Sequence, residues 1–175
     1  MRSSVCLLIL LCFFWGRRER WCALSSSSAA SDGYRRQVPP LLLLTGSGPF
    51  AHVFDSIWVV SPSANIDSAY EPLEKHIKTL KQKGGLVGEW DLAKLTEIID
   101  EQRKVTAEEK LRHQKTPLTS CLLLLDDWSD RPDLMKGGII TQLVCRNRQY
   151  GLTVLVLSPK CSSLSLTCRV NARWI

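Results

Sequence analysis

The sequence predicts an α/β domain in which helices flank a parallel sheet. Two apolar segments without polar alternation, Leu122–Leu125 and Gly151–Ser158, are typical of strands covered on both faces. Segments with helical periodicity lie before and between them. Because consecutive parallel strands need a long crossover, this alternation of strands and helices predicts βαβ units.

The first of these units begins with a short β-branched and aromatic run. A strand is expected at Ile57–Val60, where the run ends at the loop sequence SPS. A helix capped by Asp67 or Ser68 is expected next, with Pro72 in its first turn and the glycine pair 84–85 after its end.

A second and longer helix is expected from Trp90 to about Gln114. Its apolar residues recur at helical spacing: Leu92, Leu95, Ile98 and Ile99. Pro117 ends this helix before the leucine-rich strand. A third helix is expected to end near Arg148 and to lead into the strand at Gly151–Ser158.

Length and charge set further limits on function. With 175 residues, the chain is long enough for one domain and too short for two of ordinary size. The net charge is +6, and residues 1–40 hold six of the 23 basic side chains and two of the 17 acidic ones. The other 135 residues are therefore nearly neutral, and composition alone indicates no basic groove for nucleic acid.

The cysteines and histidines do not form a metal-binding pattern. There are seven cysteines, none in a CxxC pair, and three histidines without metal-ligand spacing. This distribution disfavours a zinc site and a disulfide framework. We expect buried reduced thiols and no structural metal.

Residues 1–40 form a leader that differs from the rest of the chain. Its apolar run, Val5–Trp15, would span about 16 Å as a helix, well short of the ~30 Å hydrocarbon core of a membrane. Two interpretations stay open. The run is the core of a secretory signal, which implies a secretory or membrane-associated protein, or the leader is spurious and the protein is cytoplasmic or nuclear. In both cases we expect the leader to be disordered.

Asp126 and Asp127 are the strongest candidates for a functional site. They follow the leucine-rich strand at its carboxyl end, which is where open α/β sheets bind ligands. In the Walker B element of P-loop NTPases, one such carboxylate faces Mg²⁺ and the next polarises the attacking water. The alternative is that two acidic residues end a buried strand and begin a turn.

Four segments, in order, resemble the DNA-packaging ATPases of large double-stranded DNA viruses, the poxvirus-type branch of the FtsK-HerA superfamily. They are FDSIWVVSPSANIDSAY, LLLLDDW, CRNRQYGLTVLVLS and LSLTCRVNA, within residues 54–175. The resemblance implies a P-loop NTPase fold of the RecA/ASCE type and hydrolysis of ATP with Mg²⁺. It also implies double-stranded DNA as a partner and assembly into a homo-oligomeric ring.

The resemblance further implies roles for single residues. Asp126 would bind the metal and Asp127 would activate water, as Walker B residues do. Arg148 matches the arginine of an arginine-histidine pair, and Arg169 with Asn171 matches an R-x-N element. The arginine of that element would reach the triphosphate of a neighbouring subunit. The alternative for Arg169 is a surface salt bridge.

Two positions depart from the family pattern. Gln149 stands where the family has histidine, and Pro159 falls at a polar sensor position. Proline has no side-chain donor or acceptor and cannot orient a water molecule.

Gly46, Ser47 and Gly48 are the candidate phosphate-binding loop. A Walker A loop, GxxxxGK[ST], needs a lysine and a hydroxyl, but Pro49 and Phe50 stand in these places. Only five residues separate this loop from the FDSIWVV segment, too few for the helix and crossover that should follow.

We therefore expect residues 41–175 to form a partial P-loop ATPase-like domain, a truncated or degenerate packaging ATPase with impaired ATP binding. Two alternatives stay open. One is a non-enzymatic secreted or membrane-tethered α/β protein, and the other is an inactive partner subunit in a ring of intact ATPases.

Overall fold

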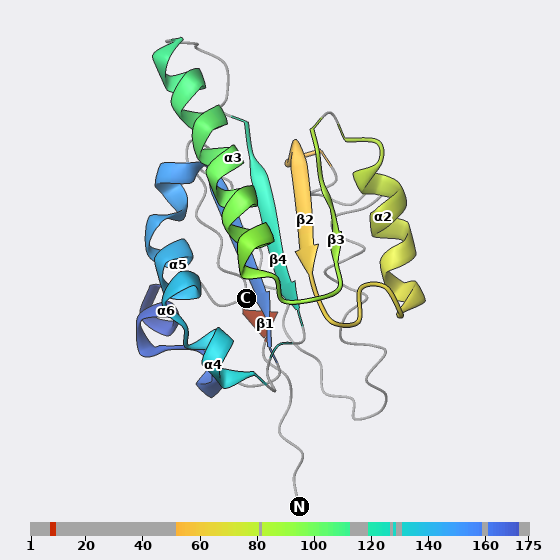
Figure 1. The fold of residues 1–175 in the computed structure, drawn as a ribbon, viewed down its shortest axis with the longest axis vertical. Helices are drawn as coiled ribbons and strands as arrows, with labels where there is room; N and C mark the ends of the chain where they lie inside the picture. Colours follow the sequence, from red (N-terminus) through yellow and green to blue (C-terminus); the bar gives the residue numbers. More distant parts are fainter. Residues whose placement is uncertain are drawn as a thin grey trace, which may run out of the picture.

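The centre of the molecule is a sheet with the strand order β1-β5-β4-β2-β3 (Figure 1). This computed structural model describes residues 8–9, 52–80, 82–112, 119–126, 128, 131–158 and 161–171. Four strands are parallel: β2 (Ser56–Val60), β3 (Gly85–Val87), β4 (Cys121–Asp126) and β5 (Leu152–Leu157). The two-residue β1 (Leu8–Ile9) pairs with β5 in the antiparallel direction.

The helices lie on both faces of this sheet. They are η2 (Ser68–Tyr70), α2 (Glu71–Ile77), α3 (Leu92–Leu111), α4 (Pro132–Met135), α5 (Gly138–Tyr150), η3 (Cys161–Ser163) and α6 (Leu166–Asn171). Residues of η2 and α2 pack on one face, and residues of α3, α4, α5 and α6 pack on the other (Figure 1). The predicted α/β class with a parallel sheet is confirmed.

The four consecutive leucines of β4 pack alternately on the two faces of the sheet. Leu123 and Leu125 pack into the cluster under α3 and α5, whereas Leu122 and Leu124 pack into the cluster under α2. All four are buried, because successive side chains of a strand point to opposite faces and helices cover both.

The predicted ends of α3 and α5 agree closely with the structure. Asp91 caps α3, since its Oδ1 atom accepts hydrogen bonds from the backbone N–H groups of Ala93 and Lys94 at 2.8 and 3.1 Å. Gly151 ends α5 in the left-handed conformation with a φ of 63°, which favours glycine, and β5 begins at the next residue.

The structure differs from the sequence prediction around the glycine pair 84–85. Helix α2 ends at Ile77, and residues 78–80 after it form turns. Gly85 does not end a helix but begins β3, a strand that the sequence did not predict. Gly84 lies against β2, where an added Cβ would come within 2.5 Å of the carbonyl oxygen of Ile57.

The expectation of buried thiols holds for two of the three cysteines with described side chains. Cys121 and Cys168 are buried, whereas Cys145 on α5 is exposed, and all three are free. The candidate loop Gly46–Gly48 lies outside the described residues, as does the leader except for Leu8 and Ile9.

Candidate functional site

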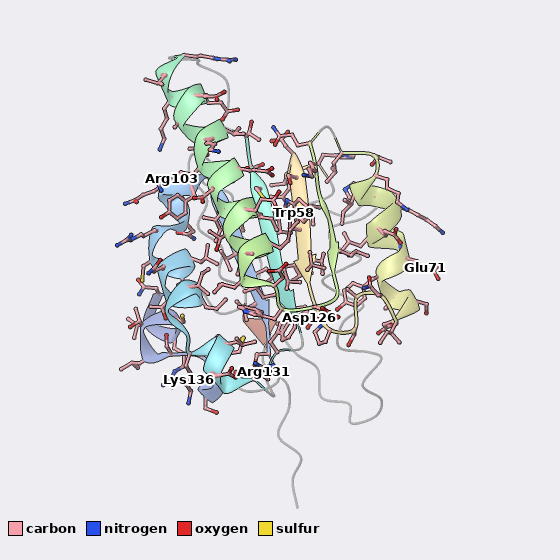
Figure 2. The ribbon with its side chains drawn as sticks, viewed as in Figure 1. Trp58, Glu71, Arg103, Asp126, Arg131 and Lys136 are labelled. Carbon is pink, nitrogen blue, oxygen red and sulfur yellow. The ribbon has the colours of Figure 1, made fainter. Side chains whose placement is uncertain are left out.

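The carboxyl ends of β2 and β4 meet where the chain reverses its direction across the sheet. After β2 the chain moves to β3 on one side, and it then returns to β4 and β5 on the other side. In open α/β sheets, such a switch point forms the crevice in which ligands bind. Asp126 is the last residue of β4 and lies at this edge (Figure 2). Ser61 directly follows β2, so it lies at the same edge.

Asp126 belongs to a buried polar cluster on the α2 face of the sheet. Its carboxylate accepts a hydrogen bond from the hydroxyl group of Tyr70, the last residue of η2. The hydroxyl oxygens of Tyr70 and Ser61 are 3.2 Å apart. Asp126 is 4% exposed and Tyr70 is 1% exposed, so this cluster is shielded from water. We refer to Ser61, Tyr70 and Asp126 as the rim cluster.

The SPS loop after β2 is shaped by the same serine. The backbone N–H of Ser63 donates to the Oγ atom of Ser61 at 3.2 Å, which closes a short side-chain turn. The backbone N–H of Ser61 donates to the carbonyl oxygen of Val87 at 3.0 Å. Ser61 therefore ties the end of β2 both to its own loop and to β3.

The environment of Tyr70 keeps its hydroxyl protonated. Burial raises the pKa of Tyr70 far above its usual value of 10.0, and the negative charge of Asp126 and the hydrogen bond to it add to this effect. At physiological pH the hydroxyl is thus a fixed donor toward Asp126.

Two tryptophans close the other face of the sheet at the same edge. The indole N–H of Trp128 donates to the carbonyl oxygen of Val60 at 2.9 Å. The rings of Trp128 and Trp90 meet edge to face with centroids 5.3 Å apart. Sequence reasoning gave no role to Tyr70 or Trp128, although both stand in the segments that carry the family resemblance.

The carboxyl end of β5 carries a pair of serines. The hydroxyl oxygens of Ser158, which follows β5, and Ser163, which ends η3, are 2.8 Å apart and buried. Pro159, expected at the sensor position, lies outside the described residues. The edge of the sheet therefore presents hydroxyl groups after both β2 and β5, on the two sides of Asp126.

The residues of the R-x-N element lie on α6, which packs against α5. The hydroxyl oxygens of Thr141 on α5 and Ser165, which precedes α6, are 3.2 Å apart. Arg169 is half-buried, and its Nε atom is buried without a hydrogen-bond partner in the part of the chain that the structure describes. The side-chain amide of Asn171 donates to the carbonyl oxygen of Thr167 at 2.9 Å.

The structure does not bring all the predicted site residues together. Asp126 extends toward the α2 face, whereas α6, with Arg169 and Asn171, packs on the opposite face. Arg148 lies on α5, but its side chain is outside the described part. Asp127 and the loop Gly46–Gly48 are also outside it, so that the paired carboxylates and the phosphate loop stay predictions.

The described residues do not by themselves form a site for Mg²⁺. Within the described ranges no three histidine, cysteine or acidic side chains are placed to hold a metal ion. Asp126 supplies one carboxylate, and one of its oxygens already accepts from Tyr70. Magnesium sites in nucleotide-binding proteins add waters and substrate phosphates to one or two carboxylates. Asp126 alone fits only one part of such a site.

Comparisons of the chain with protein-family models, with curated proteins and with solved structures found no match. None of the helices in the described ranges is both long and apolar enough to cross a membrane. A functional proposal therefore rests on the rim cluster, on the fold around it and on the sequence motifs.

Removing the Tyr70 hydroxyl is expected to destabilise the fold. Tyr70→Phe deletes a buried hydrogen bond to a carboxylate, and we expect it to lower the free energy of unfolding by about 1.5–3 kcal/mol. The midpoint of thermal unfolding should fall by about 3–10 °C. Tyr150→Phe is the control, since no hydrogen bond of the Tyr150 hydroxyl occurs within the described part. Equal losses in both variants would contradict the role of the rim cluster.

Proposed function

We propose that this protein is a degenerate relative of the P-loop DNA-packaging ATPases, which has kept the Walker B strand and lost ATP hydrolysis. The observation that carries the proposal is Asp126, a buried carboxylate at the end of a central strand and at the switch point of the sheet. In P-loop enzymes the carboxylate that faces Mg²⁺ occupies this place.

The positions of the family-like segments support this proposal. The first segment runs from β2 through the SPS loop to η2, and the second ends β4. The third includes the end of α5 and β5, and the fourth includes α6. Three of the four segments thus contribute to the carboxyl edge of the sheet, where nucleotide chemistry takes place in α/β folds.

Loss of hydrolysis follows from the sequence before β2. Pro49 and Phe50 supply neither the lysine charge nor the hydroxyl that a P-loop brings to the phosphates and to Mg²⁺. A carboxylate without these groups repels a triphosphate. Double-stranded DNA and a ring of subunits remain partners that the resemblance implies.

Nucleotide binding and turnover by the purified protein test the proposal. We expect no phosphate release above the rate without protein and a dissociation constant for Mg-ATP weaker than about 1 mM. Turnover at an ordinary enzymatic rate of about 1 s⁻¹ or more, unchanged in Asp127→Asn, would show that the Walker assignments are wrong.

A gain of function gives the sharper test, because a negative result alone has several causes. A complete GxxxxGKT loop followed by a helix is inserted between Leu44 and Phe54. We expect this variant to bind ATP in a Mg²⁺-dependent manner, and Asp126→Asn in the same background to abolish the Mg²⁺ dependence. Binding that is indifferent to Asp126→Asn would remove Asp126 from the nucleotide site. Circular dichroism of both variants verifies that they fold.

A further inference from the structure

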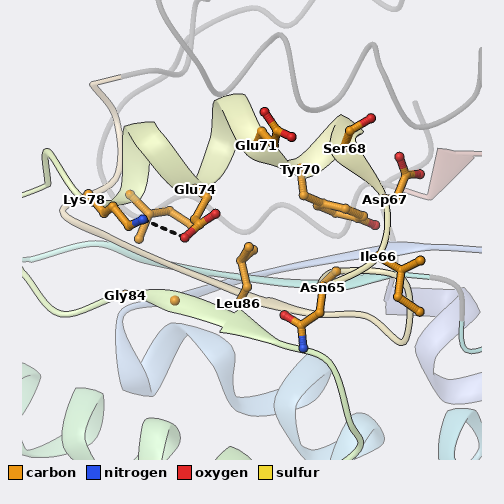
Figure 3. Close-up of a pocket in the computed structure, with 13 residues that line it drawn as sticks. Asn65, Ile66, Asp67, Ser68, Tyr70, Glu71, Glu74, Lys78, Gly84 and Leu86 are labelled. Carbon is orange, nitrogen blue, oxygen red and sulfur yellow. Dashed lines mark ion pairs between the residues drawn. The ribbon is translucent and has the colours of Figure 1, made fainter.

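A groove of about 430 Å³ lies between α2 and β3, and Tyr70 of the rim cluster is one of its lining residues (Figure 3). Glu71, Glu74 and Lys78 line it from the helix side, and Gly84 and Leu86 line it from the sheet side. The close-up shows Tyr70, Glu74 and Lys78 on the side of the helix that faces the strand, with Leu86 of β3 below them. One wall of this groove is therefore a strand and the other is a charged helix.

The strand wall is an edge of the sheet. β3 stands last in the strand order, and among the described residues no strand pairs with its outer side. The carbonyl oxygen of Val87 accepts from Ser61, so the backbone groups of Val87 point toward β2. Because backbone groups alternate in direction along a strand, the N–H and C=O of Leu86 point outward. A further strand can pair with them.

The helix wall carries negative charge. Asp67, Glu71 and Glu74 line the groove, and Lys78 is the one basic side chain among the lining residues that the structure describes. Lys78 is already paired with Glu74 at 2.7 Å, whereas none of the ion pairs among the described residues involves Glu71. A positively charged occupant is therefore favoured by charge complementarity.

An apolar side chain stands at one end of the same groove. Ile66 is 87% exposed, although it lines the groove next to η2. An exposed isoleucine beside a strand edge with which no described strand pairs gives an extended peptide an apolar contact in addition to main-chain hydrogen bonds.

We propose that this edge of β3 binds an extended basic segment of a partner protein by strand addition. The backbone of Leu86 pairs with the segment, and its lysine or arginine side chains face Glu71 and Asp67. Main-chain pairing supplies affinity, and the acidic wall selects basic sequences. This binding surface does not depend on nucleotide, and it stands whether or not the ATPase proposal holds.

The charge part of the proposal is tested with a labelled peptide of alternating arginine and valine and with the full chain, by fluorescence anisotropy. We expect saturable binding that weakens as salt is added. Glu71→Lys should weaken binding about fivefold. Glu108→Lys, the same change of charge at an exposed position of α3, should leave it unchanged. Absence of binding, or equal effects of the two variants, overturns the proposal.

The backbone part is tested with two further changes. Leu86→Pro removes the outward N–H and leaves the ladder to β2 intact, and we expect about tenfold weaker binding. A peptide N-methylated at alternate residues on its pairing side should bind equally poorly to the unchanged protein. Full affinity of the methylated peptide shows that the contact is not strand addition and overturns the proposal.

A third arm identifies the source of the basic segment, because the leader of this chain itself carries six arginines. These arginines are replaced by glutamine in the full chain. Unchanged affinity for the probe supports a separate partner protein. An increase of about tenfold shows that the leader of the chain competes for the groove and overturns the partner-protein proposal.

Discussion

Raising the pH from about 9 to 12 is expected to lower the free energy of unfolding by about 3 kcal/mol through Cys121 alone. The thiol is 1% exposed, and burial raises its pKa from 9.0 to about 12, partly offset by a hydrogen bond with Ser56. Between these two values the unfolded chain loses the proton and the folded chain keeps it. The folded state therefore binds more protons, and stability falls as the pH rises.

Tyr70 adds to this loss in the same direction. The pKa of its hydroxyl in the folded protein is raised by burial and by Asp126, whereas the unfolded chain ionises near 10. Above about pH 10, Tyr70 therefore adds to the loss of folding stability that Cys121 begins at lower pH. The two buried groups thus predict alkaline unfolding in two overlapping stages.

Urea unfolding under reducing conditions at about pH 8, 10 and 12 measures the decline. Cys121→Ala removes the first stage, so we expect a flatter dependence on pH, together with a lower stability at neutral pH from the lost side chain. Cys145→Ala, at an exposed position, should follow the unchanged protein. If the stability of Cys121→Ala fell with pH as steeply as that of Cys145→Ala, burial of the Cys121 thiol would not be the cause of the decline.

The centre of the fold was predictable because its signals are local. The leucine run has no polar alternation, which requires cover on both faces, and the structure provides it for each residue of β4 from Cys121 to Asp126. Asp91 caps α3 by bonds to N–H groups two and three residues away. Features of this kind depend on neighbours in the sequence, and composition and spacing reveal them.

The rim cluster was not predictable in the same way, because it depends on register. Tyr70 and Asp126 are 56 residues apart in the chain. They meet because Val60 pairs with Leu125, which places Ser61 beside Asp126, and because η2 returns over that edge. The sequence located the carboxylate at a strand end, but only the arrangement of the strands identifies its hydrogen-bond donor.

Strand β3 was missed because its residues carry almost no strand signal. It has three residues, the first is a glycine, and all three are half-buried. Its place in the sheet depends on contacts with β2, where a Cβ added at Gly85 would lie 3.2 Å from the ring of Trp58. Glycine is depleted in strands in general, so a glycine pair was read as a helix end.

Substitution of Gly84 by alanine is expected to destabilise the protein by about 3 kcal/mol or more. The added Cβ would lie 2.5 Å from the carbonyl oxygen of Ile57 and 3.0 Å from a methyl group of Ile77. Ile57 belongs to β2, which is paired on both sides, so its backbone cannot yield without disturbing β3 and β4. The clash must separate β3 from the sheet or strain α2.

Gly138→Ala is the matched control for this prediction. Gly138 begins α5, and no heavy atom lies within 4 Å of an added Cβ. Alanine favours the helix over glycine by up to about 1 kcal/mol, so we expect this variant to be equally or more stable. In urea unfolding, the free energy of unfolding should fall for Gly84→Ala and should stay equal or rise for Gly138→Ala. Similar stabilities would mean that β3 does not lie against β2, and the groove beside it would lose its strand wall.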